Sequence, residues 1–260
     1  MDTLPPWAEL LQEAVRTPGL LMEAYSAFHH YSTGNQLLAL WQCHSRGLPV
    51  GPLNTYPGWQ KLGRQVRKGE KALTLLMPVT VKDKRAESAG TDEEGQRFTA
   101  FIYKPHWFVL TQTEGADPPL LEIPAFDADR ALASLGIERL PFERMDGNCQ
   151  GYAKGQGIAI SPLAQLPHKT FFHETAHVVL GHTAEGACLD GDATPRNLRE
   201  IEAESVALIC CESLNLEGAA FCRGYIQDWL AGATEIPDKS AQKIFRAADL
   251  ILRAGTTHPA

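Results

Sequence analysis

The sequence predicts an α+β protein in two parts, in which helices and a small antiparallel sheet precede a mostly helical second part. Three observations support this prediction. Amphipathic patterns of helical period open the chain and return after residue 126, strand-like apolar runs lie between residues 72 and 112, and the proline-rich stretch TEGADPPLLEIPA (113–125) separates the two parts. With 44% hydrophobic residues among 260, the chain can bury a sizeable core.

The first part begins with helices and continues with strands. A possible helix cap, Ser32 or Thr33, precedes the apolar stripe of the third helix. Glycines and prolines then interrupt the pattern before a short helix. The helices are expected at residues 5–15, 18–30, 34–46 and 59–66, and two strands at 72–81 and 98–103 with a polar loop at 82–97 between them. The segment HWFVLTQ (106–112) follows the second strand.

The second part is expected to contain a glycine-punctuated hairpin, at 150–162, among five helices. Helix-start signals stand at Asp127, Pro167, Thr194 and Pro195. The helices are expected at 127–137, 167–182, 194–216, 217–231 and 238–254. This organisation predicts a first domain at 1–115, a linker at 116–123 and a second domain at 124–260.

Charge is distributed unevenly along the chain. The formal net charge is −7, yet residues 44–85 hold nine Lys or Arg against two acids, or +7. Residues 124–260 hold 12 basic and 18 acidic side chains, or −6. The acidic total argues against a protein that only coats nucleic acid, and the asymmetry predicts two parts with different partners.

Cysteine usage and hydropathy predict the compartment. The six cysteines form no Cys-x-x-Cys pair, which favours buried free thiols in a reducing environment. The N-terminal sequence lacks the basic region and apolar stretch of a signal peptide, and no run reaches the roughly 18 apolar residues that span a membrane. We therefore expect a soluble, cytoplasmic protein without a membrane partner.

The segment FFHETAHVVLGH, residues 171–182, contains a His-Glu-x-x-His pattern. On a helix, His173 and His177 lie one turn apart on the same face, where both imidazoles can bind one ion. Glu174 lies beside this pair and can accept a proton from a metal-bound water, which makes it the candidate catalytic base. The pattern predicts one zinc ion per chain, for which Mn or Co could substitute.

A third metal ligand has to come from another segment. The metzincin arrangement is excluded, because it needs Gly and His where this chain has Leu180 and Thr183. His182 follows His177 by five residues, about 140° further around a helix, and is expected to point elsewhere. Candidates for a group that steadies a tetrahedral intermediate are Tyr152, His182 and Tyr225.

The segment REIEAESVA offers the missing carboxylates. Glu200 and Glu204 share one helix face, and Glu202 points away from it. A ligand carboxylate followed four residues later by an acid that hydrogen-bonds a ligand histidine fits zinc peptidases of the gluzincin type. Glu200 is therefore the expected third ligand and Glu204 the expected histidine partner, although the reverse assignment stays open. The plainer interpretation is that these histidines and glutamates are ordinary solvated helix residues.

Residues 31–71 interleave aromatic, amide and basic side chains. Basic groups neutralise phosphates, and aromatic faces stack on the unpaired bases of single strands. The plainer interpretation puts Trp41 and Trp59 in the core and the basic side chains on a solubilising face. The candidate residues for binding single-stranded DNA are Tyr31, Asn35, Gln36, Trp59, Lys61, Arg64, Arg67, Lys68 and Lys71.

At these residues the chain resembles a known family. YSTGNQLLALWQ, WQKLGRQVRKGEKALTLLMPV and FVLTQTEG, in this order, resemble the N-terminal single-stranded-DNA-binding domain of ArdC-type antirestriction proteins. FHETAHVVLGH, EIEAESVALICCESLNL and YIQDWL resemble the zinc metallopeptidase-like domain that follows it. The resemblance covers most of the chain and does not extend to the loop at 83–96.

The resemblance implies an α/β DNA-binding domain at 1–115 and a zincin-like metallopeptidase domain of α+β fold at 124–260. It implies an antirestriction protein, encoded by a plasmid or mobile element, that protects incoming single-stranded DNA during conjugation. It also supports His173 and His177 as ligands and Glu174 as base. It does not identify a protein or peptide substrate.

Three functions compete on this basis. The first is a DNA-binding metallopeptidase that serves antirestriction. The second is a single-stranded-DNA-binding protein whose metal domain is structural or inactive, and the third is a regulatory peptidase that cleaves a repressor. The complete His-Glu-x-x-His pattern with its acid pair favours the first over the second. The +7 segment with interleaved aromatics favours the first over the third.

Overall fold

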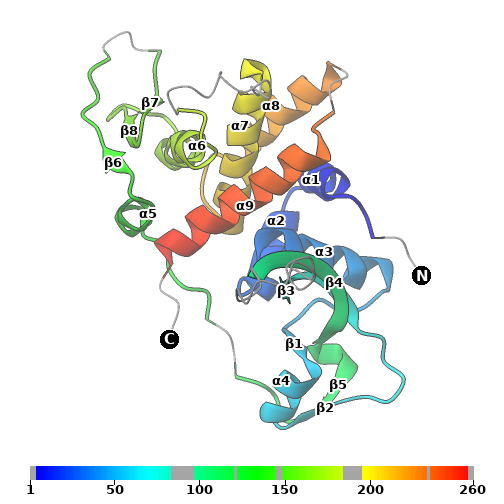
Figure 1. Cartoon of the computed structure of the whole chain (residues 1–260). Helices are drawn as coiled ribbons and strands as arrows, with labels where there is room; N and C mark the ends of the chain where they lie inside the picture. Colours follow the sequence, from blue (N-terminus) through cyan, green and yellow to red (C-terminus); the bar gives the residue numbers. More distant parts are fainter. Residues whose placement is uncertain are drawn as a thin grey trace, which may run out of the picture. The chain divides into compact units, whose positions relative to one another are not determined.

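A computed structural model describes residues 4–82, 97–119, 122–144, 148–183, 195–232 and 235–256. The chain divides into two compact units. The sheet unit is Leu38–Pro119, and the helical unit combines Met1–Leu37 with Leu120–Ala260. Figure 1 labels the elements of both units. The mixture of helices with small sheets confirms the predicted α+β class at this level.

The sheet unit contains two small antiparallel sheets, one short helix and the C-terminal part of α3 (Thr33–Ser45). One sheet has the strand order β1-β4-β3, and the other pairs β2 with β5. The elements are β1 (Leu53–Thr55), α4 (Tyr56–Lys61), β2 (Arg64–Val66), β3 (Leu73–Lys82), β4 (Arg97–Val109), a 3-10 turn (Leu110–Gln112) and β5 (Thr113–Gly115).

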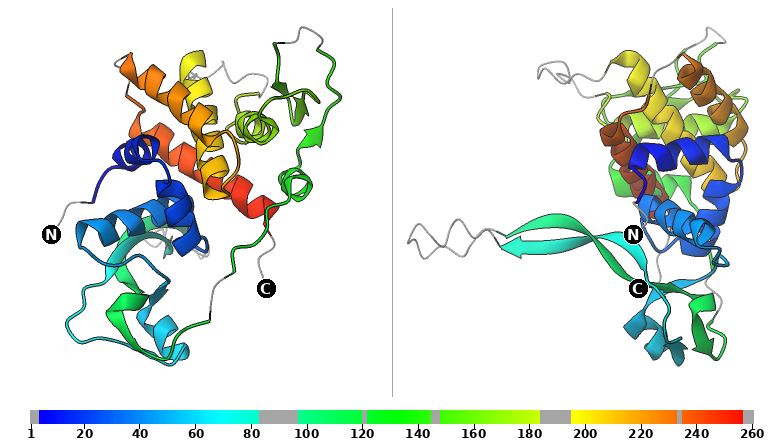
Figure 2. Two further views of the ribbon diagram at one scale, coloured as in Figure 1. Left: turned by 180° about the vertical axis from the view of Figure 1, so that it is seen from behind. Right: turned by 90° about the vertical axis from the view of Figure 1, so that its right-hand side faces the viewer.

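Strands β3 and β4 form a long, twisted two-stranded ribbon, which extends to the left in the right-hand view of Figure 2. β1 pairs only with the end of β4, so most of the ribbon has no third strand among the described residues. Three consecutive apolar or aromatic residues of β4 are therefore exposed to solvent: Phe101, Ile102 and Tyr103 are 64%, 38% and 46% exposed.

The core of the sheet unit is organised by polar side chains as well as apolar ones. The amide of Gln42 in α3 donates to the carbonyl of Thr74 and accepts from its N–H, both at 2.8 Å, which fixes α3 to β3. Trp59 of α4 is buried, and its indole N–H donates to the carbonyl of Phe108 on β4 at 2.8 Å. Both contacts satisfy backbone groups that the sheets leave unpaired.

The short helix predicted at 59–66 is misplaced. The helix starts earlier, because Thr55 accepts a hydrogen bond from the N–H of Gly58 and Pro57 stands in the first turn. It ends earlier because Gly63 adopts a positive φ of 71°, which reverses the chain, and the following residues form β2. The strand predicted at 98–103 is longer than expected, because β4 continues to Val109 before the 3-10 turn.

The helical unit consists of seven helices, the N-terminal part of α3 and one three-stranded sheet among its described residues. Its elements are α1 (Trp7–Arg16), α2 (Leu20–Phe28), α5 (Ala128–Leu135), β6 (Glu138–Arg139), β7 (Gly151–Lys154), β8 (Gly157–Ile160), α6 (Pro167–Val179), α7 (Arg196–Ser213), α8 (Ala219–Ala231) and α9 (Asp238–Gly255). These bounds confirm the predicted hairpin and the helices of the second part.

Helix α7 is the centre of the helical unit. All its residues from Ile201 to Ser213 are buried, and it packs against α2, α6, α8 and α9. A helix that is buried on every side has no polar face turned to water, so its acidic residues need partners inside the unit. The glutamates in its first half find those partners on and just after α6.

The first helices of the chain are fixed to its last third by a buried ion pair. Glu212 of α7 and Arg223 of α8 contact each other, and the guanidinium of Arg223 also donates to the carbonyls of Ala14 and Val15 at the end of α1. The second carboxylate oxygen of Glu212 accepts from the N–H of Leu21 at 3.1 Å, in the first turn of α2. These bonds satisfy backbone groups that helix ends leave free.

The small sheet has the order β6-β8-β7 and packs against α6. β7 lies at its edge and pairs only with β8 within the described part of the chain. Gly151, the first residue of β7, permits a close approach to α6. A Cβ atom at this position would lie 2.6 Å from Cγ2 of Thr170 and 3.1 Å from Cγ of Glu174.

The helix-start signals are mostly confirmed. The carboxylate of Asp127 accepts from the N–H of Arg130 at 2.8 Å, and Pro167 is the first residue of α6. Pro195 stands one position before α7 rather than in its first turn, and Thr194 lies outside the described residues. Most of the loop predicted at 82–97 also lies outside them.

The predicted domains at 1–115 and 124–260 stay a prediction. By spatial contact, α1, α2 and the first residues of α3 group with the helical unit. Residues 120 and 121 of the predicted linker, 116–123, are not among those described. None of the helices in the described part of the chain combines the length and hydropathy that crossing a membrane requires.

Candidate metal centre

Helix α6 brings its two histidines together on one face. Their spacing of four residues gives ring centroids 4.8 Å apart, as expected for neighbours one turn apart. On the same helix Phe172 is only 1% exposed and contacts the ring of Phe126, so that the apolar side of the helix is anchored in the core. The burial of this side leaves the side of His173 and His177 turned towards a cavity.

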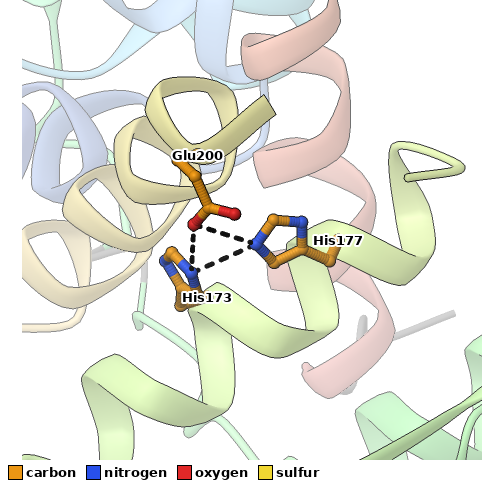
Figure 3. A group of neighbouring side chains, drawn as sticks. All are labelled: His173, His177 and Glu200. Carbon is orange, nitrogen blue, oxygen red and sulfur yellow. Dashed lines mark hydrogen bonds and ion pairs between the residues drawn. The ribbon is translucent and has the colours of Figure 1, made fainter. Parts of the chain in front are cut away.

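A carboxylate from α7 completes the group. Oε2 of Glu200 lies 3.4 Å from Nε2 of His173 and 3.6 Å from Nε2 of His177, and the two Nε2 atoms are 3.1 Å apart. Figure 3 shows the three side chains converging from two helices. The Glu200 side chain is 37% exposed, so the group is open to the cavity. The structure therefore brings together the three residues that the sequence predicted as ligands.

The spacing of these donor atoms suits a small divalent ion. Tetrahedral coordination with bonds of about 2.0–2.2 Å places neighbouring ligand atoms about 3.3–3.6 Å apart. The three measured spacings, 3.1, 3.4 and 3.6 Å, lie close to that range. Two imidazoles and one carboxylate are also a donor set of catalytic zinc sites, which keep a further position open. The residues present thus fit a metal ion in both geometry and chemistry.

The outer nitrogen of His173 faces a second carboxylate. Oε2 of Glu204 lies 2.8 Å from Nδ1 of His173, on the side of the ring opposite to Glu200. Glu204 is 2% exposed, and the ammonium of Lys169 lies 2.9 Å from the same oxygen. The structure therefore brings Glu200 to the Nε2 atoms and Glu204 to Nδ1.

The outer nitrogen of His177 faces another histidine. Nδ1 of His177 and Nδ1 of His182 are 3.0 Å apart, and Nε2 of His182 lies 3.0 Å from Oε2 of Glu202. As predicted, His182 is not one of the three grouped donor residues. Its ring nevertheless lies against His177, because α6 ends at Val179 and the helical angle no longer applies. The prediction that Glu202 points away from the other two glutamates is correct, and this direction leads it to His182.

Burial and charge shift the pKa values around the group in a consistent way. Hydrogen bonds from His173 and then His177 hold the pKa of Glu200 well below its usual range. Burial lowers the pKa of His173, but its contacts with Glu200 and Glu204 outweigh this effect and raise it to about 9. The carboxylates therefore stabilise a positive charge at this point, which either a proton or a metal ion can supply.

Glu174, the residue after the first histidine, is buried at the wall of the cavity. Burial raises the pKa of its carboxyl group, and the neighbouring histidines partly oppose the rise. A carboxylate with a raised pKa is a stronger base than one in water. The sequence predicted this residue as the catalytic base, and the structure puts it within the same cavity as the two histidines.

The cavity measures about 1080 Å³. Its walls come from α6, the start of α7, the turn after α6 and the β7–β8 hairpin. Tyr152 of β7 lines it, but its hydroxyl donates to the carbonyl of Pro141 at 2.8 Å. His182 also lines the cavity, whereas Tyr225 is not among its lining residues.

Several residues predicted to contact DNA are used within the fold. Trp59 is 1% exposed, and Gln36 is buried with its amide donating to the carbonyl of Tyr31 at 2.8 Å. Arg64 is 7% exposed and donates to Thr113 Oγ1 at 2.8 Å and to the carbonyl of Gly115 at 2.9 Å. These three side chains would have to leave the core to meet a nucleic acid. Tyr31 and Asn35 are half-buried.

The remaining basic candidates are exposed. Arg67 and Lys68 stand in a turn in which the N–H of Glu70 donates to the carbonyl of Arg67 and Gly69 has a φ of 92°. This is the geometry of a type II turn, whose central residues project into solvent. Lys61, at the end of α4, and Lys71, just before β3, are exposed as well. Among the candidates of the sheet unit, Trp59 and Arg64 are thus buried within the fold, whereas the four remaining cations are exposed.

The helical unit brings two imidazoles and a carboxylate together at a cavity, and the same chain contains a separate sheet unit. These features define a two-part protein with a candidate metal centre. Residues 3–105 match the family described as the N-terminal domain of anti-restriction factor ArdC. This part of the chain is an ArdC-type N-terminal domain.

Known proteins are similar to this chain over most of its length. An uncharacterised protein, y4eC, of Sinorhizobium fredii is 28% identical over 222 residues, which are 76% of this chain and 69% of that protein. The metal-free crystal structure of the antirestriction protein ArdC from plasmid R388 has the same fold, with a TM-score of 0.53 at 19% identity, over 98% of this chain and 96% of that one. Its Mn(II)-bound structure gives a TM-score of 0.52 at 19% identity, over 97% and 99%.

Two site residues were not found by sequence reasoning. Lys169 lies one turn before His173 and pairs with Glu204, and the spacing of four residues on α6 could have indicated it. Gly181 follows the helix and has a φ of 74°, which favours glycine. A glycine directly after a helical pattern commonly marks the end of the helix. Gly181 could therefore have indicated that His182 does not continue the helical periodicity of α6.

Proposed function

We propose that this chain is an ArdC-type protein, a metal-dependent hydrolase of peptide bonds that also binds single-stranded DNA and acts in antirestriction. The convergence of His173, His177 and Glu200 beside a buried Glu174 is the observation that carries the hydrolase part. We propose zinc as the ion, with Mn as a substitute, because R388 ArdC has a Mn(II)-bound structure and the donor set suits either metal.

The chain's own residues supply the proton transfers of such a reaction. His173, His177 and Glu200 would hold the ion, which when bound acidifies water and polarises a carbonyl group. Glu174 takes the proton from the attacking water as the new C–O bond forms. It returns this proton to the amine nitrogen as the C–N bond breaks, so that one water is added across the peptide. Burial of Glu174 supports the first transfer, because a raised carboxyl pKa makes the carboxylate a stronger base.

The shape of the cavity supports a peptide as the substrate. β7 lines the cavity over Gly151–Lys154 and carries no second partner strand within the described residues. Its free edge can hydrogen-bond an extended peptide by strand addition, which recognises backbone independently of most side chains. Because Gly151 brings this strand against Glu174, a peptide on β7 would lie close to the base. We propose a zincin-like arrangement for the helical unit on this ground.

Peptide hydrolysis is tested with a degenerate peptide library. The zinc-loaded and manganese-loaded protein is incubated with the library, and new peptide N-termini are identified by mass spectrometry. We expect cleavage that a chelator abolishes and added metal restores. If the protein binds its ion stoichiometrically and cuts no peptide, the metal has a structural role, and the alternative of a DNA-binding protein with an inactive metal domain is correct.

Binding of single-stranded DNA is proposed for the sheet unit on the strength of its exposed cations. Lys61, Arg67, Lys68 and Lys71 lie on its surface, and Tyr56 is 39% exposed beside them in sequence. Cations contact phosphates and a partly exposed ring can stack on a base, so the combination suits sequence-tolerant binding. In the antirestriction role, this binding would bring the protein to DNA that enters a cell as a single strand.

We expect the variant Lys68→Ala/Lys71→Ala to weaken binding to a fluorescent single-stranded oligonucleotide and to flatten its salt dependence. Each lost phosphate contact lowers the slope of log K against log salt by about 0.7, so two contacts lower it by about 1.4. The matched control, Lys239→Ala/Arg246→Ala, removes two exposed cations from α9 of the helical unit. Equal slopes for the two variants would contradict a specific role of the sheet unit.

A further inference from the structure

We propose that His182 and Glu202 form a relay that orients His177 for metal binding, as Glu204 orients His173. This inference rests on the proposed metal centre and assigns a role to two residues outside it. Nδ1 of His177 lies 3.0 Å from Nδ1 of His182, and Nε2 of His182 lies 3.0 Å from Glu202. The three side chains thus form a continuous chain of hydrogen bonds that ends on a buried carboxylate.

The direction of the relay follows from its last member. An ionised carboxylate only accepts hydrogen bonds, so Nε2 of His182 carries the proton that it donates to Glu202. A neutral imidazole has one donor nitrogen, so Nδ1 of His182 is an acceptor. Nδ1 of His177 must then donate, which leaves the lone pair of His177 on Nε2. That is the atom which faces His173 and Glu200.

The two histidines of α6 are therefore supported in parallel. Nδ1 of His173 lies 2.8 Å from the Glu204 carboxylate directly, and His177 reaches Glu202 through one intervening imidazole. Both carboxylates come from α7, and both are almost fully buried, at 2% and 1% exposure. A buried carboxylate that fixes the tautomer and the ring orientation of a ligand histidine raises metal affinity.

The end of α6 explains how His182 reaches its position. The N–H of Gly181 donates to the carbonyl of Val178 at 3.0 Å, and the N–H of His182 donates to the carbonyl of His177 at 2.9 Å. With Gly181 at a positive φ, these two bonds define a Schellman motif. This motif places the second residue after the C-cap, here Leu180, against the residue three positions before that cap. Here that contact, which is commonly hydrophobic, joins the imidazoles of His182 and His177.

A double-mutant cycle tests the relay, with Zn(II) affinity measured by competition against a chromophoric chelator. Glu202→Gln keeps the size of the side chain, but its amide can donate as well as accept, so it no longer dictates the direction of the relay. We expect Glu202→Gln and His182→Ala each to weaken Zn(II) binding about 10–100-fold. In combination, the two changes should weaken binding no more than His182→Ala alone, because Glu202 acts only through His182.

The matched control is Glu204→Gln, the same change on the same helix. Glu204 contacts the other histidine, so its effect should multiply with that of His182→Ala. Unfolding midpoints of the zinc-free and zinc-loaded proteins separate positioning from stability. A purely structural role of Glu202 would lower both midpoints equally, whereas the relay predicts a smaller rise on zinc binding. If His182→Ala does not fold, His182→Gln takes its place in the cycle.

Each outcome decides between the alternatives. Wild-type protein that binds no zinc would remove the proposed metal centre and the relay together. Wild-type protein that binds zinc, with Glu202→Gln binding equally well, would overturn the relay and leave the metal centre standing. A Glu202→Gln effect that multiplies with that of His182→Ala would also overturn it, since Glu202 would then act by another route.

Discussion

Replacing His177 with alanine will reduce the metal content of the purified protein from about one ion per chain to almost none. The change removes one of three donor atoms that lie 3.1 to 3.6 Å apart and leaves the relay from Glu202 without its target. Loss of a hydrogen-bonding partner of a ligand costs up to about 100-fold in affinity, and loss of the ligand itself costs more. Elemental analysis of protein prepared with added zinc measures the effect.

The matched control for this prediction is His168→Ala. His168 also belongs to α6, is exposed, and lines a different cavity from the metal centre. This variant should keep the wild-type metal content, which shows that the loss is not a general response to changing α6. Full metal content in His177→Ala would mean that the ion is held elsewhere in the chain, and the proposed centre would be wrong.

Replacing Glu174 with glutamine will abolish peptide cleavage and leave the metal in place. The amide cannot accept the proton of the attacking water, and general base catalysis typically contributes about 10²–10⁴-fold to the rate. Glutamine has nearly the same size as glutamate, and Glu174 is not one of the three residues whose donor atoms would hold the metal. Zinc binding should therefore stay close to that of the wild type. Cleavage rates with the best peptide from the library, together with metal analysis, give both readouts.

Glu143→Gln is the control for the Glu174 prediction. Glu143 also lines the cavity, but it is exposed and lies away from α6 in sequence. The same loss of charge there should leave the cleavage rate within a few-fold of the wild type. Retention of cleavage by Glu174→Gln would assign the base to another residue, even if the metal centre itself is correct.

The geometry of the metal centre could be predicted from sequence because it depends on helical spacing. Four residues separate His173 from His177 and Glu200 from Glu204, and one helical turn puts each pair on one face. The pairing of α6 with α7 then leaves few ways for these side chains to meet. Metal binding itself, and the choice of zinc, stay predictions, since they depend on solution chemistry rather than on spacing.

His182 shows where the same reasoning fails. Its angle of about 140° from His177 holds only if the helix continues, and Gly181 ends the helix just before it. The Schellman motif turns the chain back over its own last turn. Helical periodicity therefore located the candidate ligands and misplaced a residue that touches one of them.

The basic segment shows a second limit of sequence reasoning. Composition does not separate Arg64, whose guanidinium is buried against backbone carbonyls, from Lys68, which stands in an exposed turn. Burial is decided by the pairing of β2 with β5, and both strands are only three residues long. Strands of this length carry too little periodicity to be recognised before the structure is known.

The buried pair of Glu212 and Arg223 has a consequence for how the protein is made. It holds the backbone of Ala14 and Leu21, roughly 190 to 210 residues earlier in the chain. At a synthesis rate of about 5–20 residues per second, α1 and α2 leave the ribosome about 10 to 40 s before their partners do. During that interval their apolar faces are uncovered, while the sheet unit between them can already close. The first helices to be synthesised are therefore among the last to be locked, and this interval is when the nascent chain most needs a chaperone.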